Sequence, residues 1–263
     1  MAGYRLCGAK YAENPYYIEN ISTSIYSIEE LCYYFFNNVA LLDSSIINSE
    51  LTRWIATELN LPKLAENMNI ALERKKSISG FVTPVFRECG YLTGSQLDAY
   101  TARLSDYLQL PGPLRLKDKG DALTRTGKFS AAEAAYRQVI EDRKNAAFRP
   151  EFLSAVYHNL GVVLMRMLFY EEGLRAFEEA WKLRQSQKHV LAYVRALALT
   201  KPKDKALAEL RHKGLSEEEA GHVYAEAVEM INFARTASHV EMPEDVDSYV
   251  RRLMEDYHNS VGG

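Results

Sequence analysis

The side chains that could do acid–base, nucleophilic or metal chemistry are scattered along the 263-residue chain. Its histidines are His158, His189, His212, His222, His239 and His258, and none belongs to an H-E-x-x-H sequence. Glycine turns such as TRTGKF lack the pattern of a phosphate-binding loop. Glu217 to Glu219 follow Ser216, where carboxylates favour the first turn of a helix. We therefore predict no catalytic residue, no metal site and no cofactor.

The cysteines Cys7, Cys32 and Cys89 are odd in number and widely spaced. No C-x-x-C pair occurs, so neither a disulfide framework nor a zinc site of the usual spacing is indicated. We expect reduced, buried thiols.

The first residues, MAGYRLCGAKYAENPYY, contain no apolar core of a signal peptide. The apolar run at 31–42 is too short to cross a bilayer and is split by Asn37 and Asn38. We expect a cytoplasmic protein with no membrane partner.

Composition and charge are those of an ordinary globular protein, with 47% hydrophobic and 25% charged residues. The net charge is -3, and the basic residues are dispersed, although residues 112–149 hold more Lys and Arg than Asp and Glu. Nucleic-acid binding needs a concentrated basic face. We therefore do not expect a nucleic-acid partner.

The N-terminal part of the chain is predicted to form a helical domain at 1–110. Its first 26 residues, rich in Tyr, Asn, Ile and Ser, are typical of an irregular or partly extended arm. Ser27 and Glu30 have the spacing of a capping box, which starts a helix. Apolar periodicity then favours helices at 28–41, 45–59, 62–72, 80–91 and 94–109. The sequence LPGPLR at 110–115 disfavours a helix and marks the predicted boundary.

The aromatic run Tyr33, Tyr34, Phe35 and Phe36 must face nearly all sides of its helix. Core and interdomain packing is the favoured use. A surface for self-association into a homo-oligomer is the alternative.

Two segments in the second predicted domain, 111–263, align without gaps: they begin at 116 and 157, an offset of 157 − 116 = 41 residues. In the first, the pattern residues are Leu116, Gly120, Leu123, Gly127, Phe129, Ala132, Tyr136 and Val139. In the second, they are Tyr157, Leu160, Gly161, Leu164, Tyr170, Gly173, Phe177 and Ala180. Together these residues resemble the tetratricopeptide repeat, with two units over 114–183. Small residues such as Gly120, Gly161 and Gly173 would let paired helices approach closely.

The match to the family departs from its pattern at several places. Lys119 stands where Leu is usual, and Leu168 where Gly often makes the turn. The family's period is 34 residues, so the additional residues are expected at 143–152, as an extended connection or a longer helix. A third unit is degenerate, because Arg195 occupies a small position and Ala198 a large one. Further helices are predicted at 186–199, 203–213, 216–236 and 243–259.

The resemblance implies an all-α fold in which an N-terminal helical domain precedes a short tetratricopeptide-like α-solenoid with C-terminal capping helices. It also implies a scaffold or adaptor that holds a peptide or helix of a partner protein in a groove, lined by the first helix of each pair. The matching positions are Lys117, Asp121, Arg125, His158, Asn159, Val162 and Arg166.

Some relatives clamp the terminal carboxylate of a partner with Lys and Asn, and Lys117 and Asn159 match two of those positions. Asp121 stands where the clamp has Asn, and its charge would repel a carboxylate. The alternative is that these are ordinary solvated groove residues, and that Lys117 and Asp121 form an i, i+4 ion pair.

An alternative function is a transcriptional or signalling regulator in which the 45–76 region contacts DNA and the repeats sense a peptide. The helices at 45–59 and 62–72 have the spacing of a helix-turn-helix unit, but the second offers little beyond Lys63 and two Asn. A plain helical hairpin is favoured. Neutralising Lys63, Arg74, Lys75 and Lys76 should weaken any salt-dependent DNA binding.

Overall fold

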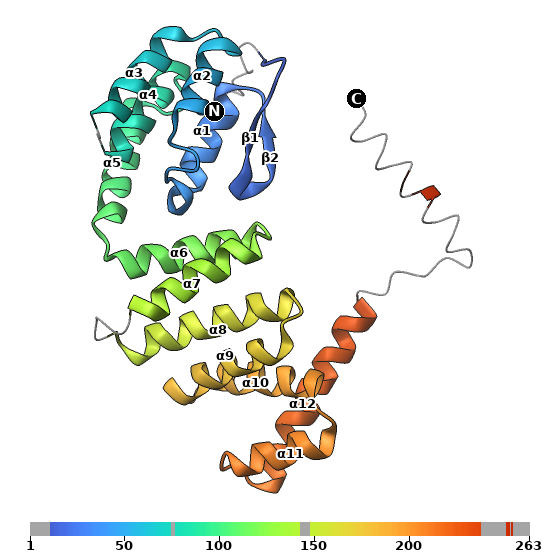
Figure 1. Ribbon diagram of the computed structural model, residues 1–263. Coiled ribbons are helices and arrows are strands. Elements are labelled where there is room, and N and C mark those ends of the chain that lie inside the picture. The colour runs from blue at the N-terminus through green and yellow to red at the C-terminus, as the bar shows by residue number, and fades with distance from the viewer. Residues whose placement is uncertain (1–10, 75–76, 143–147, 238–250, 253, 255–263) are drawn as a thin grey trace. The chain divides into compact units, whose positions relative to one another are not determined.

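The computed structural model describes residues 11–74, 77–142, 148–237, 251, 252 and 254. Over these residues the fold is all-α, with twelve labelled α-helices and one short β-hairpin (Figure 1). None of the described helices is both long and apolar enough to cross a membrane. The chain divides into two compact units, Met1–Ala196 and Leu197–Gly263. The predicted boundary at 110 lies inside the first unit, where one helix ends and the next begins.

The first unit starts with an antiparallel hairpin of β1 (Tyr16–Ile18) and β2 (Thr23–Ile25), joined by the 3-10 turn η1 (Glu19–Ile21). The part of the predicted arm that is described is therefore partly extended and firmly packed. Trp54 donates its indole N–H to the Asn14 carbonyl at 2.8 Å, and the Asn14 amide N–H bonds the Glu58 carboxylate at 3.1 Å. Residues 1–10 lie outside the described part.

Five helices follow the hairpin: α1 (Ile28–Asn37), α2 (Ser49–Thr57), α3 (Pro62–Glu73), α4 (Ile78–Cys89) and α5 (Gly94–Gln109). The capping box of Ser27 and Glu30 starts α1 as predicted. The helix predicted at 28–41 ends early, because the Asn37 and Asn38 side chains donate to the carbonyls of Tyr33 and Tyr34. A 3-10 turn, η2 (Val39–Leu41), continues the chain.

The start of α2 also differs from the prediction of 45, because Asn48 accepts from the Leu51 N–H at 2.9 Å and so caps the helix there. The aromatic run on α1 divides between core and surface: Tyr34 and Phe35 are buried, whereas Tyr33 is 62% exposed. Phe36 stacks on Tyr100 of α5 with ring centroids 5.8 Å apart. Core packing is thus the main use of this run.

The next four helices form two antiparallel pairs: α6 (Gly112–Arg125) with α7 (Phe129–Asp142), and α8 (Pro150–Arg166) with α9 (Tyr170–Leu183) (Figure 1). α8 has 17 residues against 14 in α6, so part of the additional length between the two segments lengthens this helix. Residues 143–147 lie outside the described part. Helix α10 (Gln187–Thr200) follows α9.

Both pairs use the same close approach between a glycine and an aromatic ring. A Cβ added at Gly120 would lie 2.6 Å from the Tyr136 ring, and one at Gly161 would lie 2.7 Å from the Phe177 ring. A Cβ added at Gly173 would likewise lie 2.9 Å from the Met165 side chain. No larger residue fits these positions without moving a neighbour.

Lys119, which departs from the repeat pattern, joins α6 to the N-terminal helices. Its ammonium lies 2.6 Å from the Asp43 carboxylate, just after η2. Burial raises the pKa of Asp43, but hydrogen bonds from Lys119 and Ser45 outweigh it and lower the pKa overall. Thr126 adds a hydrogen bond to the Asn20 carbonyl at 2.9 Å. α6 is therefore fixed to the hairpin side of the first unit.

The second unit contains α11 (Lys203–His212) and α12 (Glu217–Ala237). Both helices were predicted, and Glu217 to Glu219 occupy the first turn of α12 as expected. Gly214, at φ 96°, makes the turn between them. The helix predicted at 243–259 lies outside the described residues, apart from 251, 252 and 254.

Candidate partner-binding site

Three of the predicted groove residues meet at one carboxylate. Lys117 and Asp121 are one turn apart on α6, and their Nζ and Oδ2 atoms lie 2.6 Å apart. Asn159 reaches over from α8 and donates its amide N–H to Asp121 Oδ1 at 2.8 Å. Tyr136, on α7, donates its hydroxyl to the same oxygen at 2.7 Å. The Asp121 cluster, made of these four residues, therefore ties α6 to both α7 and α8.

The electrostatics of the cluster favour an ionised carboxylate. Burial alone raises the pKa of Asp121, but the hydrogen bonds from Lys117, Tyr136 and Asn159 outweigh it, so that the pKa is lowered. Burial and the hydrogen bond to Asp121 together raise the pKa of the Tyr136 hydroxyl. The hydrogen-bond donors Lys117, Tyr136 and Asn159 are therefore already used by the carboxylate of Asp121.

The structure corrects the expectation for His158, which is only 8% exposed and does not line an open surface. Its ring packs against Phe177 and His189, with centroids 5.5 and 5.3 Å away. Burial lowers the pKa of His158 to about 4, and the charges of Lys188 and His189 act in the same direction. Its Nδ1 has no hydrogen-bond partner among the described residues. His158 is therefore a neutral packing residue at pH 7.

The other three predicted residues are accessible. Val162 is half-buried, and Arg125 and Arg166 are exposed. The Arg166 guanidinium lies over the Phe129 ring, 5.9 Å from its centroid. These positions place two exposed cations on the first helices of the two pairs.

A cavity of about 460 Å³ opens beside α6, between that helix, α5 and the end of α1. Asp118, Asp121 and Arg125 line it from α6, and Asn37 and Asn38 line it from the end of α1. The sequence pattern placed Asp121 and Arg125 in a groove but gave no sign that the N-terminal helices would form its other wall.

Two further side chains define the chemistry of this α6 cavity. Arg103 of α5 lies over the Phe36 ring at 5.0 Å and donates to the Phe36 carbonyl at 3.2 Å, so its position is fixed. Burial raises the pKa of Asp118, with Lys117 opposing and Asp121 adding to the effect. Asp118 makes no hydrogen bond or ion pair with another described side chain. The cavity thus offers an acceptor to an incoming donor.

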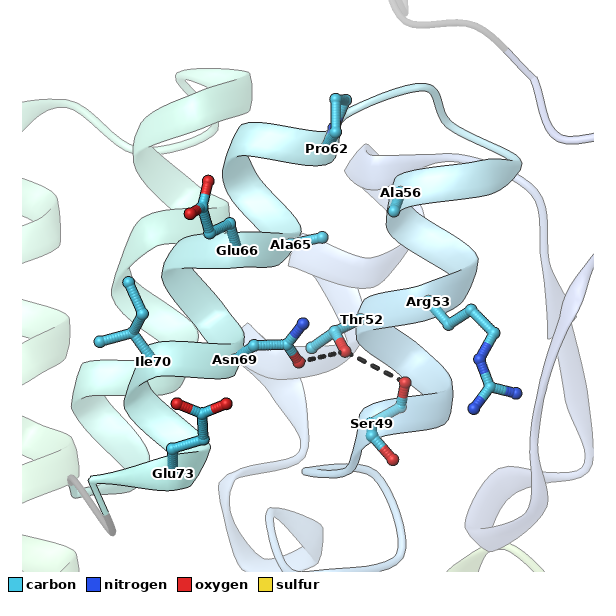
Figure 2. A pocket seen from close by; sticks show the side chains of 10 residues that line it. All are labelled: Ser49, Thr52, Arg53, Ala56, Pro62, Ala65, Glu66, Asn69, Ile70 and Glu73. Carbon is cyan, nitrogen blue, oxygen red and sulfur yellow. Dashed lines mark hydrogen bonds between the residues drawn. The ribbon is translucent and has the colours of Figure 1, made fainter.

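A second hollow, of about 650 Å³, lies between α2 and α3 (Figure 2). Figure 2 shows Thr52 bridging the two helices: its hydroxyl donates to Asn69 Oδ1 at 2.6 Å and is also bonded to the Ser49 carbonyl at 3.1 Å. Glu66 and Glu73 line this hollow with one cation, Arg53. Two carboxylates against one guanidinium oppose phosphate binding, so this surface does not favour the DNA-binding alternative.

Among the described residues, no group of three or more His, Cys, Asp or Glu side chains is arranged to hold a metal ion. In comparisons with known proteins, no family model, no curated protein and no solved structure matched the chain. The site must therefore be interpreted from its own geometry.

Proposed function

We propose that this chain is a scaffold or adaptor that binds a segment of a partner protein along α6 and α8. The observation that carries the proposal is the repetition of one packing device in two consecutive helix pairs: Gly120 against Tyr136, and Gly161 against Phe177. Such repetition supports a tetratricopeptide-like array, because stacked helix pairs present their first helices as one continuous surface.

The α6 cavity is the proposed anchoring point for the partner. Asp118 supplies an acceptor that no described side chain uses, and Arg125, two turns further along α6, supplies an exposed cation in the same cavity. Phe36 and Val39 give the same cavity apolar lining. We expect a segment that inserts an apolar side chain, presents an N–H donor or a Lys or Arg to Asp118, and carries acidic residues that meet Arg125 and Arg166.

A partner that ends in a free carboxylate at the Asp121 cluster is disfavoured. Lys117 and Asn159 would be its ligands, yet both already bind the Asp121 carboxylate, at 2.6 and 2.8 Å. A second negative charge there would have to displace the first or be repelled by it. The recognition of an internal segment, not a chain end, follows from this arrangement.

The test is partner capture with a charge-reversal variant. The tagged full chain is used to isolate partners from native lysate, and the Kd of a purified partner is then measured by calorimetry. Arg125→Glu/Arg166→Glu should raise the Kd by roughly tenfold or more, because both cations are exposed on the first helices. The matched control is Arg175→Glu, an exposed arginine on α9, the second helix of its pair.

Equal binding by the double variant and the wild type, with circular dichroism showing both folded, would contradict the proposal. Equal weakening by Arg175→Glu would contradict the assignment to the first helices. Asp118→Asn tests the cavity separately, and we expect it to weaken a partner that carries a cation there.

A further inference from the structure

Two cysteines that are distant in the sequence lie side by side in the first unit. Cys32 is in the middle of α1 and Cys89 is the last residue of α4, and their Sγ atoms are 3.1 Å apart. The Cys32 thiol also lies 3.7 Å from the Val85 carbonyl oxygen. The sequence predicted separate buried thiols, because 57 positions separate the two residues and no motif links them.

The two thiols differ in accessibility and in acidity. Cys32 is 0% exposed, whereas Cys89 is half-buried at the point where α4 ends in Gly90, at φ 58°. The hydrogen bond from the Cys32 thiol and the backbone N–H of Tyr91 lower the pKa of Cys89 against the effects of burial and the Glu29 charge. The same hydrogen bond, burial and Glu29 raise the pKa of Cys32. Cys89 is therefore the sulfur that a solute reaches first and the one that ionises first.

We propose that Cys32 and Cys89 form a redox modification site, which a hydroperoxide converts into a reversible intramolecular disulfide. The proposal is independent of partner binding along α6 and α8. It stands on the proximity of the two sulfurs and on the access to one of them. A disulfide bond is about 2.05 Å long, so the sulfurs need to approach by only about 1 Å.

The chemistry balances with hydrogen peroxide as the oxidant. The Cys89 thiolate attacks one peroxide oxygen; an S–O bond forms, the O–O bond breaks, and the leaving hydroxide takes a proton to become water. Cys32 then attacks the sulfur of the resulting Cys89 sulfenic acid. The S–S bond forms, the S–O bond breaks, and the second hydroxide leaves as water with the Cys32 proton. Two thiols lose two electrons to one peroxide, and an external dithiol reverses the step.

The cross-link would join α1 to α4 and enclose α2 and α3 between its ends. Closing a loop of this length restricts the unfolded chain, so the oxidised protein should be more stable than the reduced one. α1 also ends at the α6 cavity through Phe36 and Asn37. Oxidation would therefore fix the helix that forms one wall of that cavity.

The experiment uses the full chain with Cys7→Ser, which keeps both thiols of the pair and removes the third cysteine of the sequence. The folded protein is treated with a small excess of hydrogen peroxide, quenched, unfolded and alkylated with N-ethylmaleimide before intact-mass measurement. We expect no maleimide adduct, a mass lower by two hydrogen atoms and a tryptic cross-link between the peptides of Cys32 and Cys89. Reduction before alkylation should restore two adducts, and the melting temperature of the oxidised form should rise by roughly 5–10 °C.

A second variant assigns the order of events. In Cys7→Ser/Cys32→Ala the sulfenic acid on Cys89 has no resolving thiol, so a dimedone adduct should appear at Cys89, whereas the buried Cys32 of Cys7→Ser/Cys89→Ala should give much less adduct. Two alkylated thiols after peroxide treatment would overturn the proposal. A covalent dimer in place of the internal cross-link would also overturn it.

Discussion

The two helix pairs share one packing device but surround it with different chemistry. In α6/α7 the ring is Tyr136, whose hydroxyl bonds Asp121 at 2.7 Å; in α8/α9 the ring is Phe177, and Val162 takes the position that matches Asp121. The glycine contact is present in both pairs. It follows that the glycine contact holds each pair together, whereas the Asp121 cluster is an addition that also links the first pair to the second.

The strongest test of this comparison is to replace Gly120 and Gly161 with alanine, one at a time. In Gly120→Ala the new Cβ pushes on a ring that is hydrogen-bonded to Asp121, whereas in Gly161→Ala the Phe177 ring has no such bond to keep. We expect urea unfolding to show losses of about 3 kcal/mol and about 2 kcal/mol, net of the better helix propensity of alanine. Gly94→Ala, where the added Cβ meets open space, should change stability by less than about 1 kcal/mol. Equal losses at the two glycines would show that the hydrogen bond does not restrain Tyr136.

The Asp121 cluster can be removed by giving the first pair the residues of the second. Asp121→Val leaves three donors without their acceptor, and we expect a loss of about 2 kcal/mol in urea unfolding. Adding Tyr136→Phe to that variant removes the hydroxyl that has lost this acceptor and keeps only a 3.4 Å contact with the Thr124 hydroxyl, so it should recover part of the loss. If the double variant is less stable than Asp121→Val, the hydroxyl of Tyr136 has a role outside the cluster.

The pH dependence of that loss has a definite sign. The pKa of Asp121 is lower in the folded chain than the value of about 3.9 expected when unfolded, so its contribution is full above that value and disappears as the pH falls through the folded pKa. The difference in stability between wild type and Asp121→Val should therefore shrink in acid. A difference that stays constant down to pH 2 would contradict an ionised carboxylate.

His158 occupies the position in the second pair that Lys117 occupies in the first, and it responds to pH in a different range. Its pKa is about 4 when folded and about 6.5 when unfolded, so neutral His158 favours folding above pH 6.5 and this contribution is lost as the pH falls toward 4. We expect about 1–2 kcal/mol of lost stability between pH 7 and pH 5 by urea unfolding. In His158→Phe the free energy of unfolding should change less between pH 7 and pH 5. An unchanged pH dependence in this variant would show that other groups cause the loss.

Local signals in the sequence predicted the helix starts well where a capping box is present. α5 has the predicted bounds, 94 and 109, because Thr93 and Gln96 form a capping box at its start and Pro111 follows its end. α1 and α2 were predicted too long, since asparagine side chains can either continue a helix or bind its terminal backbone groups, and the apolar pattern does not distinguish the two.

What the sequence missed depends on contacts between distant elements. The Cys32–Cys89 pair exists because α1 packs on α4, and the α6 cavity exists because the end of α1 lies beside α6. His158 is buried because His189, at the start of α10, covers its ring. No spacing along the chain encodes these three placements, whereas Lys117 and Asp121 were predicted as a pair because one helical turn separates them.

The smallest expected difference between the two pairs lies at their turns, where Gly127 and Leu168 occupy matching positions at φ 76° and φ 66°. Leucine is strained in this left-handed region and glycine is not. Leu168→Gly should therefore stabilise the chain by about 0.5–1 kcal/mol, because the Leu168 residue is 67% exposed and gives up little packing. Gly127→Ala should destabilise it by a similar amount. A loss of stability in Leu168→Gly would mean that its exposed side chain makes contacts worth more than the strain, and the two turns would then differ in kind as the rings do.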